Sequence, residues 1–470
     1  MSGRRRRPPR AAAAARPTPS QDTIAAPATP PGRSAIAVVR ISGPDAVPVA
    51  LGRLRPQSAL GDRRPIVARL VDESERELDR VLVTLYQAPA SYTGEDVVEI
   101  SCHGSPILAR KLLELCLSEG ARLAEPGEFT QRAFLNGKVD LAQAEAVRDL
   151  IESRTGFQAR KAAEQLGGRL SRALQPIRDR LVRVISHMET SLEFVEDDVE
   201  PDAREALLLE LSAVDEDLAA LEESHRFGRP LQEGVTVAIV GKPNAGKSSL
   251  FNALLKSDRA IVTEIPGTTR DSLSETAEIG GIPFLLVDTA GIRQASETVE
   301  RLGVERSRQA MQEADIALFV LDGSRPLDEE DDAIWREIKD RPAVLAVNKS
   351  DLPQRCSLPR AWIQRAAAAE VSALKGTRLD FLREALREAA APGSGVETEG
   401  VIITSVRHCR CLQKARAALG QGRQAYAAGL SEEFPLYDLR KALDAVGEIT
   451  GETTVEEMLG EIFSNFCIGK

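Results

Sequence analysis

The stretch Gly241-Lys242-Pro243-Asn244-Ala245-Gly246-Lys247-Ser248 decides the fold of the middle of this 470-residue chain. It has the form of a phosphate-binding loop, in which two glycines let backbone N–H groups turn toward phosphates, a lysine neutralises them and a serine hydroxyl holds magnesium. An apolar run at 235–240 precedes the loop, and helical spacing of apolar residues follows it at 249–255. This strand, loop and helix predict a nucleotide site rather than a glycine-rich turn.

Four further stretches follow in an order that predicts a GTPase. Residues 288–291 (DTAG) end an apolar run, and residues 267–271 (GTTRD) precede it. Residues 348–351 (NKSD) end another run, and the Asp351 carboxylate there can accept two N–H bonds from guanine. Residues 372–374 (SAL) can offer a backbone N–H to the guanine oxygen. The βα alternation around these stretches predicts a Ras-like, doubly wound, mostly parallel sheet with its ligand loops at the carboxyl ends of the strands.

The expected nucleotide contacts gather in these loops. Magnesium is expected on Ser248 and Thr269. The predicted GTP-binding residues are Asn244, Ala245, Gly246, Lys247, Ser248, Ser249, Thr263, Glu264, Ile265, Pro266, Gly267, Thr268, Thr269, Asp288, Thr289, Ala290, Gly291, Asn348, Lys349, Asp351, Ser372, Ala373 and Leu374.

The residue after Gly291 is Ile292, which cannot orient an attacking water as the glutamine of many small GTPases does. Either hydrolysis is poor, or another residue and another cation act. Asn244 and the segment ahead of Gly267 offer oxygen atoms for a monovalent cation beside the phosphates. Glu300 can orient water, although its spacing also fits a solvated carboxylate paired with a nearby arginine.

Length and pattern predict several domains. We expect a disordered basic tail at 1–21, an α+β domain at 22–137, a helical domain at 138–233, an inserted G domain at 234–391 and the second part of the helical domain at 392–470. In the α+β domain, the predicted strands are 35–41, 81–86 and 97–100. Arg40 and Glu99 interrupt them where a binding site could lie, although a solvated strand face also explains both residues. The helix that resumes at Leu207 is expected to end at Gly228.

Composition limits the partners and the compartment. The net charge is −10 although residues 1–20 carry six arginines and no acid, so the rest of the chain is acidic and generic binding of nucleic acid is not expected. That arginine-rich start also fits an organellar transit peptide, the lower-ranked alternative to a bacterial cytoplasm. No apolar run reaches the length of a membrane span. The six scattered cysteines indicate reduced thiols, and Cys409 and Cys411 beside His408 lack the further ligand of a zinc site.

With these motifs, residues 22–470 closely resemble the family of the tRNA modification GTPase MnmE, also called TrmE. The resemblance rests on the GTPase motifs and on residues 28–33 (ATPPGR), 91–99 (SYTGEDVVE), 126–138 (PGEFTQRAFLNGK) and 466–470 (FCIGK). It implies a homodimer whose N-terminal domain binds a tetrahydrofolate derivative, the 5,10-methylene or 5-formyl form, through Arg40, Glu99, Lys138 and Lys470. It also implies that Cys467 is a required thiol. Ser34-Ala35 replaces the family's usual Gly-Gly, and Pro27 also departs from its pattern.

The same resemblance implies a potassium ion held by Asn244, Thr263, Ile265 and Thr268, with Glu300 orienting the catalytic water. It further implies an FAD-dependent partner of the MnmG (GidA) type in a heterotetramer. That complex would form a 5-carboxymethylaminomethyl or aminomethyl group on the wobble uridine of certain tRNAs. Two other functions share the GTPase motifs: a ribosome-assembly or regulatory GTPase, which would carry a basic KH-like RNA-binding segment not found here, and a dimerisation scaffold.

Overall fold

The computed structural model describes residues 22–193, 201–258, 274–288, 313–393, 400–453 and 456–470. The chain divides into two compact units, each assembled from distant parts of the sequence. The first unit takes in the described residues up to 148 together with 166–174 and 443–470, and the second takes in those of 149–165 and 175–442. Within the described part of the chain, no helix combines the length and the apolar character needed to cross a membrane.

A seven-stranded sheet forms the framework of the first unit, in the order β3-β4-β5-β6-β2-β1-β7. The strands are β1 (Ile24–Pro27), β2 (Ile36–Ser42), β3 (Leu54–Pro56), β4 (Ile66–Val71), β5 (Glu77–Tyr86), β6 (Val97–His103) and β7 (Arg122–Leu123). Only the pairing of β1 with β7 is parallel among these neighbours. The three strands expected from the sequence are confirmed, because they fall in β2, β5 and β6, and β1, β3, β4 and β7 are additional.

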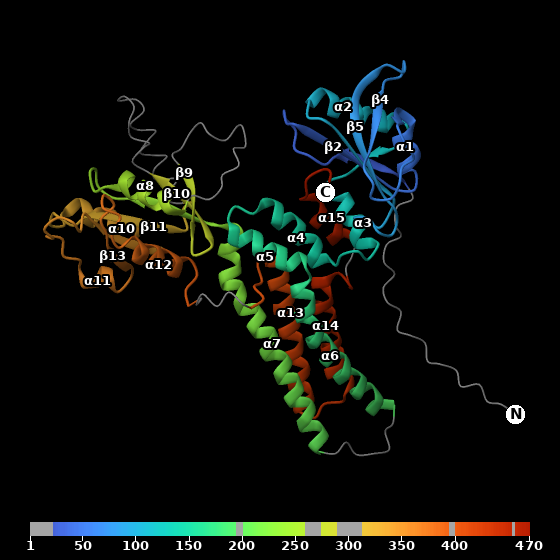
Figure 1. Cartoon of the computed structure of the whole chain (residues 1–470). Helices are drawn as coiled ribbons and strands as arrows, with labels where there is room; N and C mark the ends of the chain where they lie inside the picture. Colours follow the sequence, from blue (N-terminus) through green and yellow to red (C-terminus); the bar gives the residue numbers. More distant parts are fainter. Residues whose placement is uncertain (1–21, 194–200, 259–273, 289–312, 394–399, 454–455) are drawn as a thin grey trace. The chain divides into compact units, whose positions relative to one another are not determined.

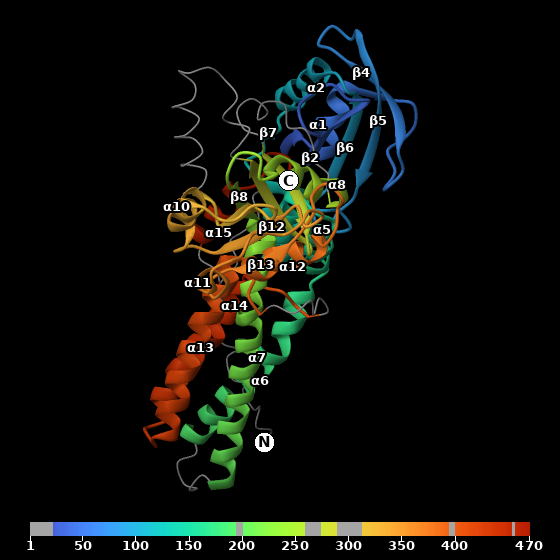
Figure 2. The same ribbon diagram turned by 90° about the vertical axis from the view of Figure 1, so that its left-hand side faces the viewer.

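One face of this sheet is apolar, because buried residues alternate along each strand. Val39 and Ile41 of β2 are fully buried against helices α1 (Ala46–Arg53) and α2 (Pro106–Ser118), which lie together on that face (Figure 2). Val38 and Arg40, which alternate with these two residues along β2, therefore point to the opposite face. Arg40 and Glu99 are cross-strand partners in the register of β2 with β6, so both belong to that second face.

The end of the chain packs on the last elements of the first unit. Helices α3 (Glu128–Leu135) and α4 (Leu141–Glu152) supply Phe134 and Leu141 to a small core with Phe463 of α15 (Glu456–Ser464). Beyond α15, Ile468 forms a β-bridge with Pro126, and the Phe129 N–H donates to the main-chain oxygen of Lys470 at 3.1 Å. These bonds hold the terminal segment against the start of α3.

Long helices make up part of the second unit: α5 (Gly156–Leu166), α7 (Pro201–Glu233), α13 (Val406–Ala427), and most of α6 (Arg169–Glu193) and the first half of α14 (Glu433–Thr450), whose remaining residues belong to the first unit. α7 and α13 lie side by side (Figure 1). The prediction that a helix ends at Gly228 is wrong, because α7 continues to Glu233. Gly228 serves packing instead: a Cβ there would lie 2.0 Å from the Ile403 carbonyl oxygen.

The second sheet follows the doubly wound pattern that the sequence predicts, in the order β13-β12-β11-β8-β10-β9. Its strands are β8 (Val235–Val240), β9 (Ser274–Ile279), β10 (Ile282–Asp288), β11 (Ile316–Asp322), β12 (Ala343–Asn348) and β13 (Ala367–Glu370), with only β9 antiparallel among these six. One core lies beneath α8 (Lys247–Asp258) and α12 (Leu379–Ala390), and the other beneath α10 (Glu329–Ile338) and α11 (Arg360–Ile363). Helices thus cover both faces.

Candidate functional site

The phosphate loop connects β8 to α8 in a conformation that its glycines permit. Gly241 and Gly246 have φ values of 144° and 97°, and a Cβ on Gly241 would lie 2.3 Å from the Val320 carbonyl oxygen. The Lys247 amine donates to the carbonyl oxygens of Gly241 and Lys242, both at 2.8 Å. The carbonyl groups of the loop therefore hold the Lys247 amine close to the N-terminus of α8, and a helix N-terminus favours an anion.

The predicted magnesium ligand Ser248 contacts Asp288, another of the predicted nucleotide-binding residues. The Ser248 hydroxyl donates to the Asp288 carboxylate at 2.8 Å, and Asp288 ends β10, the neighbour of β8 in the sheet. A hydroxyl and a carboxylate are oxygen ligands of the kind that Mg²⁺ prefers.

Asn348 joins the phosphate loop to the guanine loop. Its Nδ2 donates to the Ala245 carbonyl at 3.0 Å, and its Oδ1 accepts from the Ala373 N–H at 3.0 Å. Nearby, the Ser372 hydroxyl donates to Asp351 at 2.6 Å, and this bond is the main reason that the pKa of Asp351 lies below its usual value. Asp351 therefore stays ionised and able to accept guanine N–H groups.

Sequence reasoning missed one carboxylate beside the guanine loop. Asp322 ends β11, and its Oδ2 lies 2.7 Å from the amine of Lys349, which has a φ of 64°. Burial opposes ionisation of Asp322, but the hydrogen bonds from Lys349 and Ser324 outweigh it and lower its pKa. A polar residue at the end of a buried strand was the available signal, as it was for Asp288.

Of the remaining predicted nucleotide residues, some are exposed on the surface and others lie outside the described part of the chain. Asn244 and Ser249 are exposed on the loop and at the start of α8, and Leu374 is 85% exposed. The predicted residues Thr263, Glu264, Ile265, Pro266, Gly267, Thr268, Thr269, Thr289, Ala290, Gly291 and Glu300 lie outside the described residues.

A second polar cluster lies on the second face of the first sheet, the face opposite helices α1 and α2. The Arg40 guanidinium donates through Nε and Nη2 to Glu99 at 2.9 and 2.7 Å, and their side chains are only 16% and 26% exposed. The Arg40 guanidinium also lies 5.5 Å from the centre of the Tyr92 ring. A solvated strand face therefore does not explain Arg40 and Glu99, because they form a largely buried ion pair, and their contact with folate stays a prediction.

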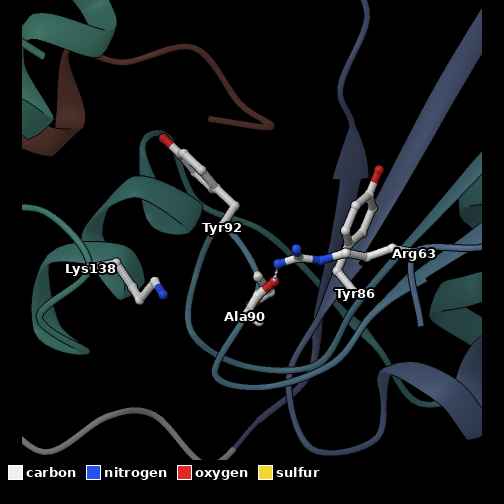
Figure 3. Close-up of a pocket in the computed structure, with 6 residues that line it drawn as sticks. Arg63, Tyr86, Ala90, Tyr92 and Lys138 are labelled. Atoms are coloured by element: carbon white, nitrogen blue, oxygen red, sulfur yellow. Dashed lines mark hydrogen bonds between the residues drawn. The ribbon is translucent and has the colours of Figure 1, made fainter. Parts of the chain in front are cut away.

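A cavity of about 560 Å³ opens beside Tyr92, and Arg63, Tyr86, Ala90, Ser91 and Lys138 complete its lining. Arg63 and Tyr86 lie on one side and Lys138 on the other (Figure 3). The Lys138 amine donates to the Pro89 carbonyl at 2.8 Å, and the Tyr92 hydroxyl bonds Thr130 at 2.8 Å. Two cations and two aromatic rings suit a flat, anionic ligand.

The chain terminus belongs to the same neighbourhood. Burial, together with the positive charge of Arg40, lowers the pKa of Lys470, while Glu99 acts in the opposite direction. Cys467 is exposed, and its main-chain oxygen accepts from Gly127 at 3.5 Å. The structure thus brings together three of the four residues predicted to bind folate, and Lys138 lines the cavity next to them. The described residues include His408, Cys409 and Cys411, and among them no group of three or more His, Cys, Asp and Glu side chains could hold a metal ion.

The phosphate and guanine loops meet at the carboxyl ends of β8, β10 and β12, an arrangement that defines a P-loop GTPase.

Comparison with known proteins gives the family. The MnmE helical domain matches residues 141–467, and the GTP-binding protein TrmE N-terminus matches residues 23–138. The chain is 45% identical to the tRNA modification GTPase MnmE of Aquifex aeolicus over 451 residues, covering 96% of this chain and 100% of that protein. It is 47% identical to that of Koribacter versatilis, covering 96% and 99%. The chain belongs to the MnmE family of tRNA modification GTPases.

Among solved structures, part of the chain is similar to Aquifex aeolicus Era bound to GDP·AlF4⁻. The TM-score is 0.27 and the identity is 26%, over 39% of this chain and 66% of that one.

Proposed function

We propose that this GTPase works with an FAD-dependent partner of the MnmG type to form the 5-carboxymethylaminomethyl or aminomethyl group on the wobble uridine of certain tRNAs. The one-carbon donor is a tetrahydrofolate derivative, and GTP hydrolysis depends on potassium. The observation that carries the proposal is the Arg40–Glu99 pair with Lys470, next to the cavity between Lys138 and Tyr86. Such a site in the same chain as a GTPase domain fits modification chemistry better than a ribosome-assembly or purely regulatory GTPase.

The chemistry of folate fits these residues. Its pterin ring presents N–H donors that a carboxylate such as Glu99 can accept, and its flat surface can stack on an aromatic ring such as Tyr92. Its glutamate tail carries carboxylates that Lys138 or Arg63 can neutralise. Because Arg40 already fixes the Glu99 carboxylate, the acceptor is oriented before the ligand arrives. Cys467, exposed at the end of the same segment, is proposed as the thiol that acts near the bound folate.

In the G domain, Ser248 and Thr269 would hold magnesium, and Asn244, Thr263, Ile265 and Thr268 would hold potassium. The fit is supported by the Ser248–Asp288 pair and by Asn244, which is exposed on the phosphate loop with a φ of 63°. A bound potassium ion supplies positive charge to the phosphates in place of an arginine finger. Asp351 reads guanine, Lys247 binds the phosphates, and Glu300 orients the water.

The assembly and compartment complete the proposal. The chain acts as a homodimer through its N-terminal domain and joins the MnmG-type protein in a heterotetramer, with FAD on the partner only. tRNA is the substrate of that complex, and the complex works in the bacterial cytoplasm. The acidic charge of this chain supports a partner that supplies the basic RNA-binding surface.

The folate site is tested by titrating the purified chain with 5-formyltetrahydrofolate in a calorimeter. Glu99→Gln removes the charge that Arg40 orients, and loss of one charge-assisted contact predicts binding weaker by about 10- to 100-fold. Glu77→Gln is the matched control, because Glu77 sits in the same sheet in an exposed ion pair with Arg80. Equal affinity of Glu99→Gln and the unaltered chain would refute the assignment.

A further inference from the structure

Lys242, the second residue of the phosphate loop, forms ion pairs with two carboxylates at the start of helix α10, which lies much further along the sequence. Its amine lies 2.6 Å from Oδ2 of Asp328 and 2.7 Å from Oδ2 of Asp331, at the start of α10. The Lys242 side chain is 18% exposed and that of Asp331 only 4%. An ion pair this sheltered is screened by water far less than a surface pair.

The carboxylates that receive Lys242 are fixed by the helix cap. Asp328 is the N-cap of α10, and its side chain accepts from the N–H groups of Glu330 and Asp331 at 3.0 and 3.3 Å. Asp331 Oδ2 in turn accepts from the Asp328 N–H at 3.1 Å, which completes a capping box. A buried carboxylate needs a compensating cation, and Lys242 supplies it to Asp331. Burial disfavours the charged form of Lys242, but its bonds to Asp328 and Asp331 outweigh this and raise its pKa.

The other end of the same residue faces the phosphate-binding lysine. The carbonyl oxygens of Gly241 and Lys242 both accept from the Lys247 amine. The backbone of Gly241 lies so close to Val320 that no side chain fits there, and this contact restricts the position of the first residue of the loop. The side chain of Lys242 thus anchors the two successive peptide groups whose oxygens accept from Lys247, and movement of these groups would move the Lys247 amine.

We propose that Lys242 is a positioning residue for GTP binding: its ion pairs with Asp328 and Asp331 hold the phosphate loop in the form that presents Lys247 to the nucleotide. This strut, the ion pairs of Lys242 with Asp328 and Asp331, exists before the nucleotide arrives. It therefore stabilises the ground state and the transition state of hydrolysis alike. Its loss should therefore raise KM and the Kd for nucleotide and leave kcat nearly unchanged.

The test measures steady-state GTP hydrolysis and the Kd for a fluorescent GDP analogue with full-length variants. Lys242→Met is expected to raise KM and Kd about tenfold with kcat within about twofold, and Lys242→Arg is expected to restore most of the affinity. Lys441→Met, which removes an ion pair with Asp438 on α14, is the matched control and should bind as the unaltered chain does. A fall in kcat at unchanged KM for Lys242→Met would overturn the proposal.

Asp331→Asn separates the strut from simple electrostatics. Removing a negative charge near the phosphates should tighten nucleotide binding if only the net charge matters, whereas the strut predicts weaker binding. Asparagine keeps an oxygen that can accept the Asp328 N–H, so the helix cap survives. Trp335 and Trp362 of this domain stack with their ring centres 4.9 Å apart, so their fluorescence checks that the domain of the variant is folded. The double variant Lys242→Met with Asp331→Asn should be no weaker than Lys242→Met alone; tighter binding by Asp331→Asn, or additive losses, would contradict the strut.

Discussion

Replacement of Asn348 by alanine should uncouple the two halves of the nucleotide site. The Asn348 side chain donates to the Ala245 carbonyl in the phosphate loop and accepts from the Ala373 N–H in the guanine loop, both at 3.0 Å. The residue is 3% exposed, so water cannot easily replace these bonds. Alanine removes both bonds at once and frees each loop from the other.

The size of the effect follows from the two lost bonds. A buried hydrogen bond contributes about 0.5–1.5 kcal/mol net, so the pair is worth about 1–3 kcal/mol. If that energy holds the loops in their binding form, nucleotide affinity should fall by about 5- to 150-fold. Both GDP and GTP should be affected, because Asn348 contacts the loops and not the γ-phosphate position.

The assay is a fluorescence titration with GDP and GTP analogues at fixed magnesium and potassium. Asn136→Ala is the matched control, because the Asn136 Nδ2 also donates to a carbonyl, that of Thr93 at 2.7 Å, in the N-terminal unit. It should leave nucleotide affinity unchanged. Affinity of Asn348→Ala within about twofold of the unaltered chain would refute the coupling argument.

Three further predictions concern other parts of the chain. Cys467 is exposed and should react with a thiol reagent well before Cys116, which is buried and whose pKa burial raises to about 12; equal rates would contradict the placement of the terminal segment. Glu128→Gln should lower the thermal midpoint at pH 7. Burial opposes ionisation of Glu128, but bonds from Arg122, Glu125 and Arg132 hold its folded pKa below the unfolded value, so its stabilisation is present above about pH 4.5 and is lost as the pH falls through the folded pKa. A midpoint difference independent of pH would show that this charge is not the cause. Gly228→Ala should destabilise α7 through its contact with Ile403, whereas Gly420→Ala in α13 meets no atom within 4 Å and should stabilise by up to about 1 kcal/mol; circular dichroism melts in which both variants shift upward would contradict the packing at Gly228.

The strands and loops around the phosphate loop were largely predictable because their signals are local. The phosphate loop needs its glycines next to a strand and a helix, and the strands of the second sheet are continuous apolar runs, typical of a sheet covered on both faces. β9 escaped notice because only two of its six residues, Ala277 and Ile279, are buried. It is a strand because the turn at Gly280 and Gly281 pairs it with β10.

Contacts between distant residues were not predictable from local pattern. Arg40 and Glu99 read as solvated strand residues, since nothing in either strand indicates that β2 and β6 are neighbours in a register that pairs them. The same applies to Lys242, whose partners lie on α10. Gly228 shows the reverse error: glycine favours a helix end, yet close packing against Ile403 keeps it in the interior of α7.

The proposed potassium ion at Asn244 is tested by steady-state GTP hydrolysis with the purified chain in potassium chloride and in sodium chloride at equal ionic strength. Hydrolysis should be faster in potassium, and Asn244→Ala should remove the difference between the two salts. Equal rates in both salts for the unaltered chain would contradict a potassium ion at Asn244.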